Sequence, residues 1–410
     1  MMTIVLILVS IIAYLISNKL YRNIFNPIFI FVGVNVLSIV LSLLQDFKYS
    51  IDTICIIFIM FISFLIGIIL GVKNGFKRKK LNAYNYYPNN VYKIILILGF
   101  LYDIALIEYL HQLFKSYSLI DFFVKLNEVN AYVQSDEYKI SWYSYVVPLG
   151  MPLFLLCLFY IKHYNKNKVI IIQCFLSVLY CLSPRRDTLF NLIIVAFFFF
   201  LSNFQDRYGI FSISKKIAKY IFLVGICIVV LMSVTQELLN KDYNKVIYLQ
   251  TGPLPTYLNT PYLYISLNYP YLQNTNVDYT SLPNVPFIAS GRLAYTTANK
   301  LIGTNIDTRS DFELRFKVVG NNFITNTAPI LYYAILDLGI FFFIFFIILG
   351  FLSQRAYYSL NSDKITGRII GSIWFMVLAM SFRGYLLIYI TFILSLVYTL
   401  IISKLLKTIK

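Results

Sequence analysis

The 410-residue chain is 59% hydrophobic, and charged residues make up only 13% of it. Soluble globular proteins carry about 25% charged residues, so too few charges remain here to cover a water-soluble surface of this size. The formal net charge of +17 does not indicate nucleic-acid binding, because the basic residues lie in short clusters between apolar runs. That distribution is typical of the cytoplasmic loops of membrane proteins.

Apolar runs long enough to cross a bilayer recur along the whole chain, since about 20 apolar residues span the hydrocarbon core as a helix. We therefore predict an all-α integral membrane protein with about eleven transmembrane helices. The predicted spans are 3–18, 25–45, 51–72, 93–111, 143–161, 168–184, 187–204, 217–236, 329–352, 367–381 and 385–403. The sixth and seventh spans, and the last two, are predicted to form tight hairpins.

The distribution of Lys and Arg predicts the orientation of these helices. If the N-terminus lies outside, most of the 35 basic residues fall in the loops on the inner side. Cytoplasmic loops carry such an excess of basic residues. We therefore expect a multi-pass protein of the cytoplasmic (inner) membrane, with the N-terminus outside and the C-terminus in the cytoplasm.

The pattern divides the chain into residues 1–236 with eight helices, a large extracytoplasmic loop at 237–328, and residues 329–410 with the last three helices. Residues 112–142 carry apolar side chains at helical spacing, which predicts a helix lying in the membrane interface. The large loop is rich in Tyr, Asn, Thr and Pro, and loops of this length are usually functional or disordered. Its aromatic content argues against disorder, so we expect a folded cap of short helices and loops.

Arg185 and Arg186 lie in a short turn on the predicted outer side, where basic residues are statistically disfavoured. Guanidinium groups bind phosphate bidentately and never deprotonate, so this pair predicts an anion clamp. Asp187 would hold one of the arginines or cap the following helix. The alternative is a pair of arginines that extend to the membrane surface.

Two further arginines are predicted on the same side. Arg383 lies in a second turn between helices, and Arg292 lies in the large loop close to Tyr295. Each could also be an interface anchor or a surface residue. If these arginines converge with the first pair, they would suit a diphosphate.

Amides and hydroxyls gather where the large loop enters the next helix, at Asn321, Asn322 and Thr325, with Tyr333 following. Such groups are what a sugar-binding site needs. Asp337 follows within an apolar run, where a buried charge usually marks function or a paired structural role. The sequence therefore predicts a polar site at this membrane boundary.

The general base is not assigned by the sequence. Candidates are Asp278, Asp311 and Glu313 in the large loop. Asp103 and Glu108 lie in the fourth predicted helix, where a carboxylate marks either a functional residue or a structural partner for an arginine. No nucleotide-binding or zinc-hydrolase motif appears, so we predict no cofactor and no metal.

These features resemble the bacterial oligosaccharide repeat-unit polymerases, the Wzy-type O-antigen and capsule polymerases. The resemblance rests on the arginine turn at 183–189, on Gly291-Arg292, and on residues 320–325 followed by Asp337. The plan of about eleven helices with a large outer loop in the last third is also similar. The resemblance in helix arrangement extends over most of the chain, whereas the resemblance in sequence motifs is confined to a small part of it.

The resemblance implies a GT-C-like fold, an undecaprenyl-diphosphate-linked glycan donor and acceptor, and no metal. Arg185 and Arg186 would match the family's arginine after the sixth helix, and Arg292 its large-loop arginine. Asn322 and Thr325 would match its polar residues entering the next helix. The related ligases use an outer-loop histidine, which residues 237–328 lack, and this disfavours a ligase.

We therefore expect a metal-independent glycosyltransferase that joins lipid-linked repeat units into surface polysaccharide on the outer face of the membrane. A chain-length regulator protein is a further partner that the resemblance allows. The alternative is a transporter or flippase of the same lipids, which is disfavoured because no internal repeat or paired broken helices are found. The expected catalytic residues are Arg185, Arg186, Arg292 and Asp337, and the expected substrate contacts are Asp187, Tyr295, Asn321, Asn322, Thr325, Tyr333 and Arg383.

Overall fold

A computed structural model describes most of the membrane part of the chain and portions of the large loop. The described residues are 1–21, 25–72, 88–118, 142–164, 167–182, 186–201, 219, 222, 225–226, 262–275, 280–303, 306, 317–319, 323–325, 327–362, 364–384, 386 and 389–408.

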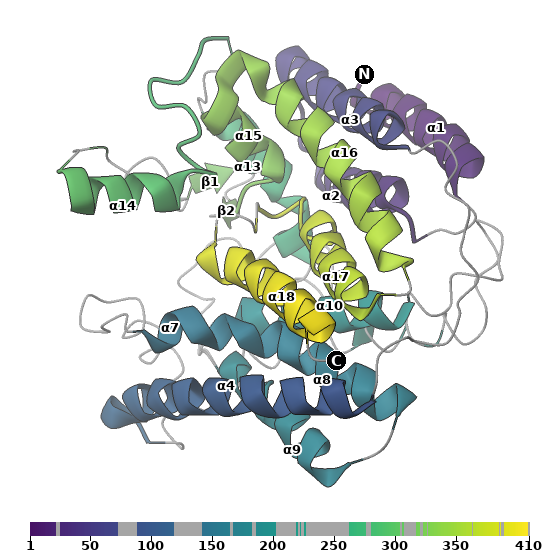
Figure 1. The fold of residues 1–410 in the computed structure, drawn as a ribbon. Coiled ribbons are helices and arrows are strands. Elements are labelled where there is room, and N and C mark those ends of the chain that lie inside the picture. The colour runs from purple at the N-terminus through teal and green to yellow at the C-terminus, as the bar shows by residue number, and fades with distance from the viewer. Residues whose placement is uncertain are drawn as a thin grey trace.

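Helices dominate these residues (Figure 1). In the first part of the chain they are α1 Met2–Leu20, α2 Pro27–Leu43, α3 Ile51–Gly71, α4 Pro88–Ser116, α7 Tyr143–Val146, η1 Val147–Leu149, α8 Gly150–His163, α9 Lys168–Leu176, η2 Leu179–Leu182 and α10 Arg186–Leu201. The later elements are α13 Asn268–Asn274, α14 Arg292–Ile302, β1 Lys317–Val319, β2 Phe323–Thr325, α15 Ile330–Leu338, η5 Gly339–Phe341, α16 Phe342–Leu360, α17 Ile365–Ala379 and α18 Ile390–Thr408.

Local signals explain where two of the membrane helices begin. The side-chain oxygen of Asn26 accepts hydrogen bonds from the backbone N–H groups of Ile28 and Phe29, both at 3.0 Å, and caps α2. The Ser50 hydroxyl accepts from Thr53 N–H at 3.2 Å and caps α3. Such caps satisfy N–H groups that have no partner within the helix.

The chain is a multi-pass membrane protein by the character of its helices. Six segments are long and apolar enough to cross a membrane, and shorter apolar helices occupy four further predicted spans. The predicted span 217–236 lies mostly outside the described residues. The count of eleven therefore stays a prediction, as does the GT-C-like arrangement.

Three predicted spans contain interruptions that the apolar runs did not predict. The span predicted at 143–161 is divided by η1, and the span at 168–184 changes to η2 after Ser177. The span at 329–352 breaks at Gly339, whose φ is 52°. A Cβ on Gly339 would meet the Ser281 carbonyl oxygen at 2.0 Å, so this position requires glycine.

Two other expectations also need correction. The last two helices do not form a tight hairpin, because α17 ends at Ala379 and α18 begins only at Ile390. The described part of the large loop also contains an antiparallel hairpin, in which Lys317 pairs with Thr325 and Val319 with Phe323. Apart from this short pair of strands, the regular elements of the described residues are helices, which confirms the all-α class.

Segments far apart in the sequence meet at one end of the helical bundle, which we call the cap end. It comprises residues 44–50, 262–275, 280–303, 327–329 and 380–384. The backbone N–H of Ile330 donates to Ser381 O at 2.8 Å, and that of Ile340 donates to Ser281 O at 3.1 Å. All these segments lie on the predicted outer side.

A second set of contacts lies at the opposite ends of the same helices. The Tyr21 hydroxyl donates to the side-chain carbonyl of Gln354, and its ring packs edge-on against Tyr357. The Arg368 side chain donates to Ser362 O at 3.0 Å. These contacts therefore involve the ends of α1, α16 and α17 that lie away from the cap end.

Helices α3 and α16 make the closest contact of the bundle. A Cβ on Gly67 would lie 2.0 Å from Ile347 O, and a Cβ on Gly350 would lie 2.2 Å from Phe64 O. Gly67 and Gly71 form a G-x-x-x-G pattern, which lets two membrane helices approach backbone to backbone. The stacked rings of Phe31 and Phe64 adjoin this contact with centroids 4.1 Å apart.

We predict that Gly67→Ala separates α3 from α16 and destabilises the protein by about 2 kcal/mol, as overpacking typically does. The measurement is thermal unfolding of the purified protein in detergent. Gly33→Ala on α2 is the matched control, since a Cβ there meets nothing within 4 Å. Equal unfolding temperatures for the two variants would contradict the close packing.

Candidate functional site

A buried hydrogen-bond network joins three parts of the cap end around Asn35 of α2. The Asn35 side-chain nitrogen donates to Phe31 O at 2.7 Å and to Ser381 Oγ at 2.8 Å. Its side-chain oxygen accepts from the Tyr269 hydroxyl at 2.7 Å. Asn35, Ser381 and Tyr269 have no exposed surface, so the network fixes α2, the cap and the turn after α17 together.

Further polar contacts seat the segment 262–275 on α2. Ser38 Oγ donates to Ile265 O at 2.5 Å, and the Tyr262 hydroxyl donates to Leu41 O at 3.0 Å. The Gln273 side chain donates to Lys48 O at 2.7 Å. These contacts make the segment a fixed wall of the cap end.

Two tyrosines of this wall are held in their neutral form. Burial, followed by the neighbouring Tyr332, raises the pKa of Tyr271 to about 12. Burial raises the pKa of Tyr269 well above its ordinary value. The Tyr269 hydroxyl therefore remains a hydrogen-bond donor to Asn35 at any physiological pH.

Arg383 lies against the same wall. Its guanidinium carbon is 4.0 Å from the centroid of the Tyr264 ring. The turn that carries Arg383 is closed by hydrogen bonds from its own N–H and from Gly384 N–H to Met380 O, at 3.0 and 3.2 Å. A guanidinium stacked on an aromatic face keeps its planar edge oriented, which favours bidentate binding of an anion.

Asp337 holds the loop that precedes α14. Its carboxylate accepts from the backbone N–H groups of Ala289, at 2.5 Å, and Ser290, at 3.2 and 3.1 Å to the two oxygens. Its carbonyl oxygen accepts from Phe287 N–H at 2.9 Å. Phe287 has a φ of 55°, a conformation that costs roughly 1–3 kcal/mol for such a residue. The carboxylate thus has the paired structural role that the sequence left open, while direct catalysis by it stays a prediction.

Other predicted site residues lie near this loop. Tyr295 donates its hydroxyl to Pro286 O at 2.6 Å and so closes the turn before α14, which Arg292 begins. Thr325 is buried, with its hydroxyl 3.0 Å from that of Thr327. Tyr333 is buried in α15. The structure brings Tyr295, Arg292 and Asp337 to one loop, and Arg383 to the neighbouring wall.

Several predicted site residues fall outside what the structure describes. They are Arg185, Asn321, Asn322, Asp278, Asp311 and Glu313, together with the side chains of Arg186 and Asp187. Arg186 begins α10, and α10 packs against α17 through Phe198 and Phe375. Convergence of the arginines therefore stays a prediction.

Asp103 has a structural partner. The Gln173 side-chain nitrogen donates to its carboxylate at 2.9 Å and links α4 to α9. Among the residues whose positions the structure describes, no three His, Cys, Asp or Glu side chains gather closely enough to hold a metal ion.

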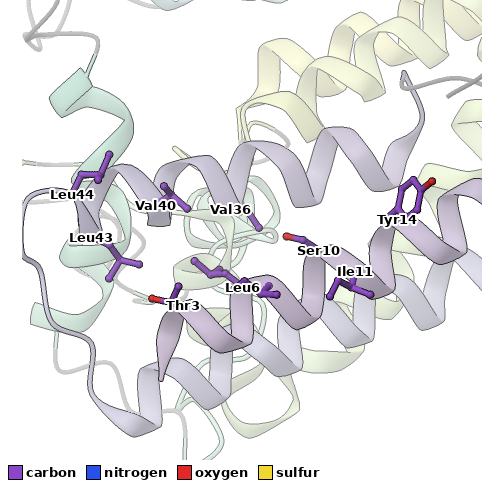
Figure 2. A pocket seen from close by; sticks show the side chains of 10 residues that line it. Thr3, Leu6, Ser10, Ile11, Tyr14, Val36, Val40, Leu43 and Leu44 are labelled. Carbon is purple, nitrogen blue, oxygen red and sulfur yellow. The ribbon is translucent and has the colours of Figure 1, made fainter. Parts of the chain in front are cut away.

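An apolar groove of about 600 Å³ separates α1 from α2 (Figure 2). Its polar lining groups are the hydroxyls of Thr3, Ser10 and Tyr14. It runs along the half of α2 nearest the cap end, from Val36 to Leu44. One helix therefore contributes to both the Asn35 network and the groove.

Sequence reasoning missed Asn35, Tyr264 and Tyr269. The available signal for Asn35 was an amide in the middle of the apolar run 25–45, because a polar side chain in lipid needs a partner. No pattern marked the two tyrosines, since the large loop contains many.

We predict that Asp337→Ala leaves the Ala289 and Ser290 amides without their acceptor and speeds their hydrogen exchange roughly tenfold or more. Asp337→Asn keeps one acceptor oxygen and should show a smaller change. Exchange read by mass spectrometry over residues 281–303 tests this. Unchanged exchange in both variants, with loss of activity, would instead mean that the carboxylate acts in the chemistry.

Comparison of the chain with protein-family models, with curated proteins and with solved structures gives no match. The chain is therefore assigned to no family on this basis, and its function is inferred from its own residues.

Proposed function

We propose that the protein is a metal-independent glycosyltransferase that joins undecaprenyl-diphosphate-linked repeat units at the cap end of its membrane domain. The observation that carries this proposal is the stacking of Arg383 on Tyr264, beside the buried network of Asn35, Ser381 and Tyr269. The Arg383 guanidinium is thereby an oriented cation at the cap end, next to aromatic and amide groups.

A diphosphate would be recognised by this cation. The developing negative charge on a departing diphosphate is greatest in the transition state, where fixed guanidinium groups stabilise it most. Arg185, Arg186 and Arg292 are proposed to complete the clamp. Asn321, Asn322, Thr325 and the neighbouring tyrosines are proposed to contact sugar hydroxyls.

The groove between α1 and α2 supports a lipid-linked substrate. It is apolar, lies along the helix that carries Asn35, and has Ile7 and Ile11 in its lining. A polyprenyl chain placed there would leave its diphosphate close to the cap end. In the proposed reaction a hydroxyl of the acceptor attacks the anomeric carbon of the donor glycan. The bond from that carbon to the diphosphate oxygen breaks, and the acceptor proton passes to a base that is not yet assigned.

One observation favours the alternative of a flippase. Interrupted helices occur in transporters, and three spans are interrupted here. Transporter breaks lie near the middle of the bilayer. Here η1 and η2 lie toward the predicted outer ends of the spans 143–161 and 168–184, whereas η5 lies near the middle of the span 329–352. The stacked Arg383 at the cap end is what makes the polymerase the better supported function.

We predict that Arg383→Ala abolishes long polymer while single repeat units are still transferred, because the clamp loses an oriented cation. Arg383→Lys should restore little of the long polymer, because lysine cannot bind a diphosphate bidentately. The readout is the glycan ladder of a deletion strain complemented with each variant.

Arg355→Ala is the matched control. Arg355 also stacks on an aromatic ring, that of Phe351 at 5.0 Å, but on the half of α16 away from the cap end. It should leave the ladder unchanged. Full-length polymer from Arg383→Ala would refute the clamp.

The deletion strain itself separates the two functions. A polymerase deletion should lose long chains and retain one repeat unit at the cell surface. A flippase deletion should instead accumulate lipid-linked repeat units on the inner leaflet.

A further inference from the structure

We infer that residues 281–302 form a membrane-inserted wedge, which places Leu282, Phe287 and Ile302 among the acyl chains of the adjoining leaflet. The partner is the bilayer lipid itself. The inference does not depend on the proposed reaction, and would hold equally for a transporter.

The first observation is the exposure of large apolar side chains on a segment outside the bundle. Leu282 is 64% exposed, Phe287 52% and Ile302 77%. Exposed apolar surface of this kind marks contact with protein or membrane.

The second observation is that this apolar surface continues the lipid-facing side of α16. Ile344, Ile348 and Leu352 recur every four residues on α16, and Ile340 of η5 precedes them at the same spacing. These four side chains are 41–53% exposed, as expected of the lipid-facing stripe of a membrane helix. The wedge adjoins the end of this stripe that is nearest the cap end. There the Ile340 N–H donates to Ser281 O, and the Phe287 N–H donates to the Asp337 carbonyl. Continuity with lipid-facing surface selects lipid as the occupant.

The third observation concerns depth. The predicted span 329–352 includes Gly339 and Ile340, and both belong to one long apolar stretch of the chain. The backbone of this stretch bonds to Ser281 and Phe287. The wedge residues packed beside Gly339 and Ile340 therefore lie at the depth of the acyl chains.

The fourth observation is the way the wedge is held. Phe287 has a strained positive φ, and Asp337 fixes the turn around it through Ala289 and Ser290. Helix α14 follows directly, is strongly amphipathic, and stands apart from the bundle (Figure 1). Amphipathic helices with these properties lie in the interface plane.

The test is site-specific photocrosslinking of the full chain in vesicles of phosphatidylglycerol and phosphatidylethanolamine. A p-benzoylphenylalanine replaces Leu282, Phe287 or Ile302 in turn, and intact-mass spectrometry identifies the adducts. Ile348 serves as the lipid-facing reference. Asn284, an exposed polar residue of the same loop, is the matched control.

Lipid adducts are expected at the three wedge positions and at Ile348, and none at Asn284. Protein dimers crosslinked through the wedge would overturn the inference in favour of a second copy of the chain. An absence of adducts at the wedge while Ile348 reacts would also overturn it, as would equal lipid adducts at Asn284.

Discussion

The break between α15 and α16 is the constraint on which the cap end depends. A bilayer offers no water to satisfy backbone polar groups, so an interrupted membrane helix survives only where protein supplies the missing partners. Here Ser281 accepts from Ile340, and Asp337 binds the loop through both its carboxylate and its carbonyl. The loop, the break and the start of α14 therefore form one unit. The hydrogen bonds within this unit fix the position of the proposed wedge.

The cap end and the middle of the bundle are built differently. At the cap end an amide, a serine and a tyrosine bury their polar groups against one another, with an arginine stacked beside them. At the middle, α3 and α16 touch through glycines without intervening side chains. Phe31, whose carbonyl accepts from Asn35, stacks on Phe64 of α3, so the cap-end network is joined to this close-packed pair of helices. Such an arrangement fits a reaction on substrates that arrive from the lipid.

Much of the membrane part was predictable because apolar run length and cap residues act locally, as at Asn26 and Ser50. The breaks were not predictable, since Gly339 lies in a continuous apolar run and the residue that requires it, Ser281, is far away in the sequence. Asp337 was correctly singled out as needing a partner. Its partners are backbone amides, which no side-chain pattern reveals. Arg383 was found from its turn, whereas the ring beneath it belongs to a loop with many tyrosines.

The pairing of α3 with α16 also has a consequence for biosynthesis. The chain between Gly71 and Phe342 must be made before α3 can meet its partner. At ribosomal rates of 5–20 residues per second this takes roughly tens of seconds. During that interval the glycine-containing face of α3 has no contact with α16, and Asn35 lacks its hydrogen-bond partner Ser381. Insertion machinery that shelters early helices would therefore govern the yield of correctly assembled protein.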